Sequence, residues 1–266
     1  MDNASDDGTA ELISGHEVVR LPRNRGYAGG LAAVLDMVDT QFVAWLNDDA
    51  APEPSWLAEL ESALNGEPGA AAATSSILLT DGSTQSVGVA LTADGHGRDV
   101  VLAGREVFGF CGGAALLRTD ELRAVGGVPA SFFCYYEDTD TAWRLRLAGY
   151  RVVSVGPARV RHRHGASTRP GSVQFHRWNE RNRLLMLLRC APAVVALRET
   201  ARFAVITALL PFRSGVPDAA NFRVGLRLGV LAEVLLRTPS ALVARAAVGR
   251  RSTVSRGDVW RTWAGR

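Results

Sequence analysis

The chain has 266 residues, of which 47% are hydrophobic and 21% charged, and its net charge is +3. This is the composition of an ordinary globular protein rather than of a disordered or fibrous one, and the length suffices for one large domain or a domain with an appendage. The three cysteines, an odd number, lack metal-type spacing. They therefore indicate a reducing compartment and free thiols rather than a cysteine metal site.

The predicted elements alternate between strands and helices. In chain order we expect strands at 16–22, 41–50 and 70–79, with helices at 31–39 and 53–65 between them. Within 107–127 we expect a strand interrupted by a glycine pair and then a short helix, and within 151–165 a strand, a turn at Gly156-Pro157 and an extended exit. Such alternation predicts an α/β fold, a mainly parallel sheet flanked by helices. Ligands of these folds bind at the carboxyl ends of strands.

The charge is divided unevenly along the chain. Residues 190–266 contain twelve arginines against four acidic residues, a net charge of +8, which leaves −5 for residues 1–189. We therefore interpret residues 1–189 as a globular domain and residues 190–266 as an arginine-rich, amphipathic helical tail.

Polar groups gather where the strands end. Asn47, Asp48 and Asp49 follow a hydrophobic strand directly. Adjacent acids repel one another, and a hard divalent cation held by carboxylate and amide oxygens would remove that cost. A solvated turn before the next helix explains the same residues and stays open.

Two further groups are ambiguous when taken alone. His162 and His164 share one face of an extended segment and fit either a metal site or a polar strand exit. Glu137, Asp138 and Asp140 stand at the start of a helix, where acids favour the free N–H groups of the first turn whatever their function. Asp140 and Arg144 lie four residues apart on this helix, and we expect them to pair.

Taken together, the motifs resemble glycosyltransferase family 2, and most closely its rhamnosyltransferase-like branch, which acts on cell-surface polysaccharides. The motifs are "DNASDDGTAEL", "NRGYAGG", "WLNDDAAPEPSWL", "GFCGGAALLRTDELRAVGG", "FFCYYEDTDTAWRLRLAGYRVV" and "VRHRHGAST", in the order expected of the family. The resemblance covers residues 1 to 189 and implies a GT-A fold. It also implies an inverting, metal-dependent transfer from a nucleotide-diphosphate sugar.

The resemblance also assigns roles to residues. It implies that Asp138 is the general base and that Glu137 contacts the acceptor. The implied nucleotide-sugar-binding residues are Asp2, Asn3, Ser5, Asn24, Gly26, Asp48, Gly112 and Gly113. The implied ligands of Mg²⁺ or Mn²⁺ are Asn47, Asp49 and His162, with His164 as the alternative histidine. The donor is dTDP-rhamnose or a UDP- or GDP-sugar, and the acceptor is a glycan or a lipid-linked glycan in cell-wall or surface polysaccharide synthesis.

One departure from the family pattern leaves a second hypothesis open. Family members begin with an additional strand and helix, whereas here the first motif starts at Met1. We therefore expect an N-terminally truncated GT-A domain. The alternative to an active enzyme is a non-catalytic remnant that serves as a binding or scaffold module.

The arginine-rich tail has no apolar run of the ~20 residues that a spanning helix needs, and its longest uncharged run is 203–212. Within 222–237, Val224, Leu228, Leu231 and Leu235 form an apolar stripe with arginines roughly opposite. The stripe fits a helix packed on the domain, or a helix docked on an anionic membrane. Nucleic-acid binding is not expected, because no aromatic residues alternate with the arginines. The expected location is cytoplasmic, peripheral at the inner face of the plasma membrane.

Overall fold

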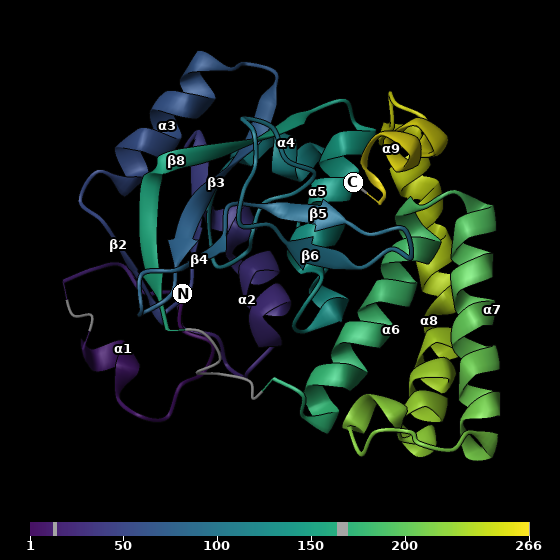
Figure 1. Ribbon diagram of the computed structural model, residues 1–266. Coiled ribbons are helices and arrows are strands. Elements are labelled where there is room, and N and C mark those ends of the chain that lie inside the picture. The colour runs from purple at the N-terminus through teal and green to yellow at the C-terminus, as the bar shows by residue number, and fades with distance from the viewer. Residues whose placement is uncertain (13–14, 164–169, 266) are drawn as a thin grey trace.

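The computed structural model describes residues 1–12, 15–163 and 170–265. The strands are β1 (Phe42–Leu46), β2 (Ala50–Pro52), β3 (Ala70–Leu78), β4 (Thr84–Ser86), β5 (Val89–Leu91), β6 (Gly97–Asp99), β7 (Ala114–Arg118) and β8 (Arg151–His162). The α-helices are α1 (Thr9–Leu12), α2 (Gly26–Val34), α3 (Trp56–Gly66), α4 (Thr119–Ala124), α5 (Glu137–Leu147), α6 (Val173–Cys190), α7 (Ala193–Leu209), α8 (Val224–Arg251) and α9 (Arg256–Trp263). Short 3-10 helices are η1 (Leu35–Met37), η2 (Ala130–Phe132), η3 (Leu210–Phe212) and η4 (Ala220–Phe222). Figure 1 shows these elements as one sheet body with a group of long helices beside it.

The main sheet has the order β1-β7-β3-β8-β2, with β4 added to β3. β3 and β8 pair in parallel, whereas β7 is antiparallel to both of its neighbours, β1 and β3. Strands β1, β3 and β8 therefore run in one direction, as the predicted α/β fold requires. The pairing is nevertheless more antiparallel than the expected mainly parallel sheet, because β7 lies between two of these strands and β2 and β4 also pair antiparallel.

The predicted strand at 16–22 is wrong. In the described residues this segment makes only an isolated parallel bridge between Asp2 and Arg20. Val18 and Val19 are half-buried rather than buried, so the apolar pair that motivated the prediction is only partly covered.

The sheet is covered on both faces, so its central strand β3 is buried on both sides. Residues 70–77 of β3 are all buried. On one face lie Trp56, Leu60 and Leu64 of α3, spaced four residues apart so that they share one side of the helix. On the other face, Trp45 of β1 belongs to a larger core that extends into α5 and α6.

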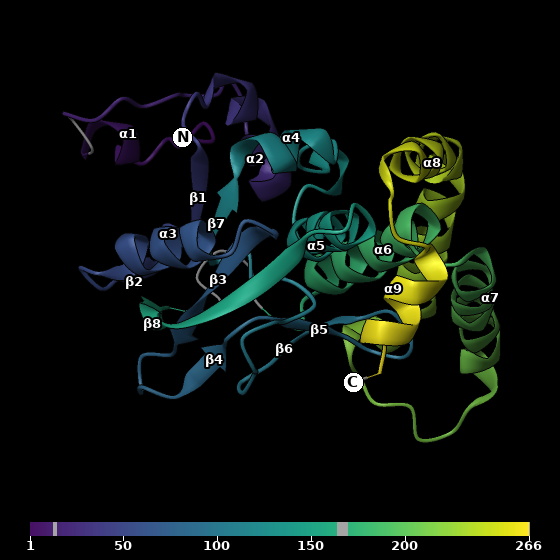
Figure 2. The same ribbon diagram turned by 90° about the horizontal axis from the view of Figure 1, so that it is seen from above.

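The arginine-rich tail packs on this body. Figures 1 and 2 show α6, α7 and α8 together at one side of the sheet, with α9 nearby. Trp260 of α9 stacks on Trp143 of α5 at 5.9 Å, and the guanidinium of Arg146 lies 4.3 Å from the ring centre of Trp263. No helix within the described ranges is both long enough and apolar enough to span a membrane.

The predicted stripe in 222–237 is oriented differently from the expectation. Arg227, expected on the polar side, is buried and lies 3.8 Å above the ring of Phe203, while its Nε donates to the hydroxyl of Thr207 at 2.9 Å. Leu228 and Leu235 of the predicted apolar stripe are 54% and 74% exposed. The inward positions are instead Val230 and Val234.

Strand β1 lies at one end of the sheet. Among residues 1–12, 15–163 and 170–265 it pairs only with β7.

Candidate active site

The predicted site residues come from segments that meet at the ends of β1 and β7. The backbone N–H of Asn47, which follows β1, donates to the carbonyl of Gly113 at 3.0 Å. The N–H of the preceding Gly112 donates to Oδ2 of Asp138 at 2.9 Å. Two hydrogen bonds thus join three segments that are distant in sequence: the end of β1, the glycine pair before β7 and the start of α5.

A side chain at position 112 would crowd Asp138. A Cβ on Gly112 would lie 3.3 Å from both Cβ and Oδ2 of Asp138, which is tighter than most side chains tolerate. The hydroxyl of Tyr27 donates to the carbonyl of the same glycine at 2.5 Å. Gly112 therefore contacts both α2 and the start of α5.

Asp138 is a half-buried carboxylate held on both oxygens. Its Oδ2 accepts from Gly112, and its Oδ1 accepts from the backbone N–H and the hydroxyl of Thr139, the latter at 3.0 Å. Burial raises the pKa of Asp138, while the hydrogen bonds from Gly112 and Thr139 oppose that rise by favouring the charged form. The result is an oriented carboxylate of increased basicity.

Glu137 lies in a more apolar environment. It is 6% exposed, and its Oε2 has no hydrogen-bond partner among the described residues. Burial, together with the neighbouring charge of Asp138, raises the pKa of Glu137 to about 8. Glu137 is therefore mainly protonated at neutral pH, and of the two carboxyl groups Asp138 is the more accessible.

Asp140, the third acid of the sequence motif, has a structural role. Its side chain is fully buried and pairs with Arg144 one turn later at 2.7 Å and with Arg189 of α6 at 3.2 Å. The expected pairing between Asp140 and Arg144 is confirmed.

The segment that precedes Glu137 has an unusual backbone. Phe133, Tyr135 and Tyr136 adopt φ values of 68°, 71° and 69°. This left-handed region costs roughly 1–3 kcal/mol for each residue that is not glycine, so surrounding contacts must hold it.

Asn182 of α6 supplies such contacts. It is fully buried, and its amide nitrogen lies within 3.0 Å of the carbonyls of Phe132, Cys134 and Tyr135. The neighbouring Arg181 donates to the carbonyl of Phe132 at 2.7 Å and pairs with Glu233 of α8 at 3.0 Å. Helices α6 and α8 thus fix the loop that presents the two acids.

The first two sequence motifs form a second cluster. The amide nitrogen of Asn3 donates to the carbonyl of Gly26 at 3.0 Å and to the side chain of Asn24 at 3.2 Å. Asp2 is buried, accepts from the N–H of Ser5 at 3.1 Å and pairs with Arg20 at 3.3 Å. Five predicted nucleotide-sugar-binding residues therefore lie in one hydrogen-bonded region.

Gly26 connects this cluster to the loop before Glu137. Its φ is +71°, and a Cβ there would lie 2.3 Å from the carbonyl oxygen of Phe133. That same oxygen accepts from the N–H of Ala28 at 3.0 Å. Only glycine fits at this contact.

Asp49 and His162 meet at the ends of β2 and β8. Oδ1 of Asp49 lies 2.9 Å from Nε2 of His162, and Oε1 of Gln85 lies 2.8 Å from Nδ1 of the same ring. Gln85 can accept a hydrogen bond from Nδ1 of His162. Nε2 of the same ring can then contact the carboxylate of Asp49 through a shared proton or through a cation that both groups bind. The donor set thus fits a divalent cation at this corner.

The remaining predicted ligands are less closely associated. The side chain of Asn47 lies against Gly113, and Asp48 is exposed. Within the described residues no three His, Cys, Asp or Glu side chains gather as a metal-binding group. His164 lies outside the described residues.

Three contributors were not predicted from the sequence: Tyr27, Gln85 and Asn182. The sequence around Asn182, "RNRLLMLL", places polar residues against a run that must be buried, which is a usable signal. Gln85 gives no such signal, because β4 reaches His162 only through the folding of the sheet.

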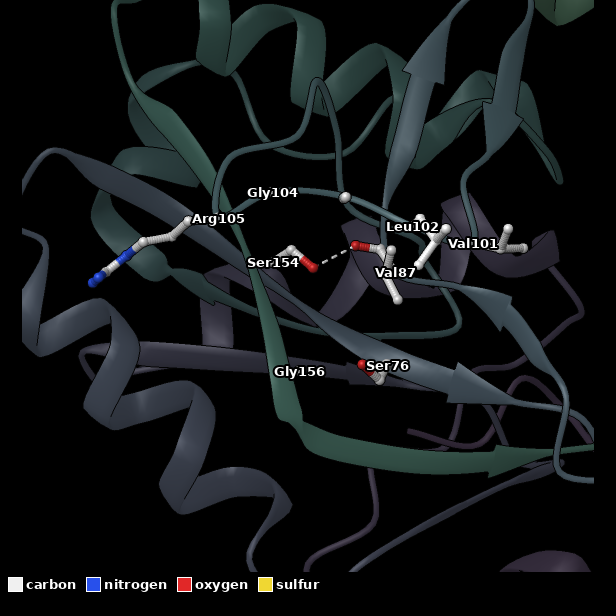
Figure 3. A pocket seen from close by; sticks show the side chains of 9 residues that line it. Ser76, Val87, Val101, Leu102, Gly104, Arg105, Ser154 and Gly156 are labelled. Atoms are coloured by element: carbon white, nitrogen blue, oxygen red, sulfur yellow. Dashed lines mark hydrogen bonds between the residues drawn. The ribbon is translucent and has the colours of Figure 1, made fainter.

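A separate hollow of about 330 Å³ lies elsewhere on the molecule. It is lined by Ser76, Val87, Val101, Leu102, Ala103, Gly104, Arg105, Ser154 and Gly156 (Figure 3). Its charged side chain, Arg105, pairs with Glu67, and the hydroxyl of Ser154 donates to the carbonyl of Val87 at 2.8 Å. None of the predicted site residues lines it.

The sheet order and the site at its strand ends define a GT-A-like α/β fold. GalNAc-T7, solved with UDP, GalNAc and Mn²⁺, superposes with a TM-score of 0.55 at 12% identity, over 84% of this chain and 46% of that one. S. aureus TarS 1–349, in complex with UDP, superposes with a TM-score of 0.50 at 14% identity, over 98% of this chain and 80% of that one. These similarities show the fold. This chain spans about half the length of GalNAc-T7.

Residues 1–126 match the family model described as Glycosyl transferase family 2. The sequence matches no curated protein. The family match includes the clusters around Asn3, Asn47 and Gly112, and it ends before Glu137 and Asp138.

Proposed function

We propose that this protein transfers a sugar from a nucleotide-diphosphate sugar to an acceptor hydroxyl, with inversion at the anomeric carbon. The observation that carries the proposal is the half-buried Asp138, held on both oxygens beside the glycine pair at the strand ends. The match of residues 1–126 to Glycosyl transferase family 2 supports sugar transfer as the chemistry.

In this reaction Asp138 acts as the general base. The acceptor oxygen forms a bond to the anomeric carbon as its proton passes to the carboxylate, and the bond to the nucleoside diphosphate breaks on the opposite face. The raised pKa of Asp138 favours proton uptake. Glu137, protonated at neutral pH, would donate a hydrogen bond to another acceptor oxygen once a ligand reaches it.

The donor would occupy the cluster of Asp2, Asn3, Ser5, Asn24 and Gly26, with Asp48, Gly112 and Gly113 nearer the diphosphate and sugar. Asp49 and His162 would hold Mg²⁺ or Mn²⁺, with Asn47 close by. When bound, such an ion neutralises charge on the leaving diphosphate. The donor set of one carboxylate and one imidazole favours a site completed by the nucleotide itself.

Our choice of donor and acceptor follows the resemblance of the motifs to the rhamnosyltransferase-like branch. We propose dTDP-rhamnose as the first donor to test, followed by UDP- and GDP-sugars. The acceptor is a glycan or lipid-linked glycan of cell-wall or surface polysaccharide synthesis, at the cytoplasmic face of the plasma membrane.

A thermal-shift screen of the three nucleotide-sugar classes, with and without Mg²⁺ or Mn²⁺, tests donor binding, because a ligand of the native state raises its apparent stability. Release of nucleoside diphosphate from the stabilising donor then tests turnover. Stabilisation without any release, with or without an acceptor, would instead favour a non-catalytic binding module. No stabilisation by any donor would contradict both functions.

A further inference from the structure

The outward face of α7 carries exposed apolar side chains along its whole length, with Arg198 and Arg202 among them. Val194, Leu197, Val205 and Leu209 are between 45% and 73% exposed, and Phe212 of η3 is 85% exposed. Their spacings of three, eight, four and three residues keep them on one side of a helix. On the opposite side of α7, Val195 and Phe203 are buried.

Helix α8 has a second face of the same kind. Leu228, Leu235, Leu236, Leu242 and Val243 are all at least 50% exposed. The charged residues within this span turn away from that face: Glu233 pairs with Arg181, and Arg237 donates to the carbonyl of Ser131. The outward side of α8 is therefore uncharged from Leu228 to Val243.

We call these ten residues of α7, η3 and α8 the outer stripe. Its two halves lie on neighbouring helices on the side of α6 away from the sheet (Figures 1 and 2). Ten exposed apolar side chains on α7, η3 and α8 mark an interaction surface rather than ordinary surface. Nothing in the described part of the chain covers it.

Arginines surround the outer stripe. Arg198, Arg202 and Arg223 have side chains that are between 56% and 60% exposed. The first two pair with Glu199 and the third with Asp218. Arg213 and Arg250 are also exposed, so positive charge remains in excess. In the described part of 190–266 the exposed acids are only Asp218 and Asp258. A second copy of this chain would bring two positive rims together, so the charge favours an anionic partner.

We propose that the outer stripe binds the surface of an anionic lipid bilayer, with α7 and α8 lying in the interface. Exposed leucine, valine and phenylalanine side chains would enter the headgroup region, and the arginines beside them would contact lipid phosphates. This docking goes beyond sugar transfer and does not depend on it.

Flotation of the full chain with vesicles tests the proposal. Binding to vesicles that contain phosphatidylglycerol should exceed binding to phosphatidylcholine alone and should fall as salt screens the arginines. The double variant Leu235→Gln/Leu236→Gln should lose at least about tenfold in vesicle affinity, because each lost apolar side chain removes buried area from the interface. Leu102→Gln, at an 89% exposed leucine of the sheet body, is the matched control and should bind as the parent does.

A second comparison tests the role of charge. The double variant Arg213→Gln/Arg223→Gln is compared with the control Arg161→Gln, which changes an exposed arginine of β8. Only the first variant should weaken binding to anionic vesicles. Equal binding to neutral vesicles, no vesicle binding at all, or equal losses in stripe and control variants would overturn the proposal. So would concentration-dependent dimerisation that the stripe variant abolishes while vesicle binding is absent. Donor-induced thermal shifts in the same variants report on the proposed sugar transfer separately, so the two proposals fail independently.

Discussion

Acidic side chains stand at two places in the candidate site, after β1 and at the start of α5, and they differ in what surrounds them. Asp49 faces the imidazole of His162 at 2.9 Å, in a polar corner that Gln85 completes. Glu137 and Asp138 stand beside each other in a buried setting, where the pKa of both is raised. In the proposed function, the carboxylate of Asp49 holds a cation and the carboxylate of Asp138 exchanges a proton.

The largest effect is expected at the proton-exchanging pair. Asp138→Asn keeps the shape of the side chain but cannot accept a proton at neutral pH. Sugar transfer should fall by about 10²-fold or more, while donor affinity, measured by calorimetry, should change little. Near-normal turnover would move the base to Glu137, because Asp140 is fully buried and paired with Arg144.

The cation corner should respond in binding rather than in proton transfer. Asp49→Ala should remove the increase in nucleoside-diphosphate affinity that Mg²⁺ or Mn²⁺ produces. Asp39→Ala, an exposed acid before β1, serves as control. Calorimetry that finds the same metal-dependent affinity in Asp49→Ala and in the parent would remove Asp49 from the metal site.

A variant in the support of the loop before Glu137 tests whether catalysis depends on how Asp138 is positioned. Asn182→Ala removes the amide that reaches three carbonyls of this loop, so the strained backbone should relax and displace Asp138. We expect kcat to fall by about tenfold to a hundredfold with little change in KM for the donor. The control is Asn179→Ala, one turn earlier on α6, whose amide nitrogen donates to the carbonyl of Phe175 on the same helix.

Melting curves of both variants separate positioning from general destabilisation. If Asn182→Ala lowers the melting temperature but leaves kcat of the folded enzyme unchanged, Asn182 is structural only.

The smallest effect concerns stability. Unfolded Glu137 loses its proton near its ordinary pKa of 4.5, whereas the folded side chain keeps it up to about 8. The unfolded state therefore binds fewer protons between these values, and folding stability falls as pH rises through this window.

Glu137→Gln removes that loss. The variant should match the parent near the lower end of the window and exceed it near the upper end. The difference should reach a few kcal/mol at most, at about 1.4 kcal/mol per pKa unit. Melting temperatures across the window measure it, with exposed Glu61→Gln as control. A difference that does not grow with pH would contradict the raised pKa.

Much of this arrangement follows from local sequence. Hydrophobic runs ending in acids, such as "FVAWLNDD", indicate a strand and what stands at its end, because a buried strand must emerge into solvent there. The α/β fold, the helix at Glu137 and the buried pair of Asp140 with Arg144 were predictable from such patterns. The GT-A-like α/β fold agrees with the resemblance of the motifs.

Other features depend on contacts between residues that are distant in sequence. The segment 16–22 has the composition of a strand but forms only a bridge, because pairing requires a neighbour as well as propensity. Helical periodicity in 222–237 does not reveal that Arg227 is buried over Phe203 while Leu228 and Leu235 face outward.

The tertiary structure alone decides the electrostatics of the site. Whether Glu137, beside Asp138, carries a charge depends on how far the surrounding elements expose it to water and on how many hydrogen-bond donors they place beside it. The sequence by itself determined which carboxylates stand at the strand ends. Only the packing of Gly112, Tyr27 and α6 around them decided that Asp138 is held by hydrogen bonds and Glu137 keeps its proton, because burial and donor geometry arise from residues far apart in the chain.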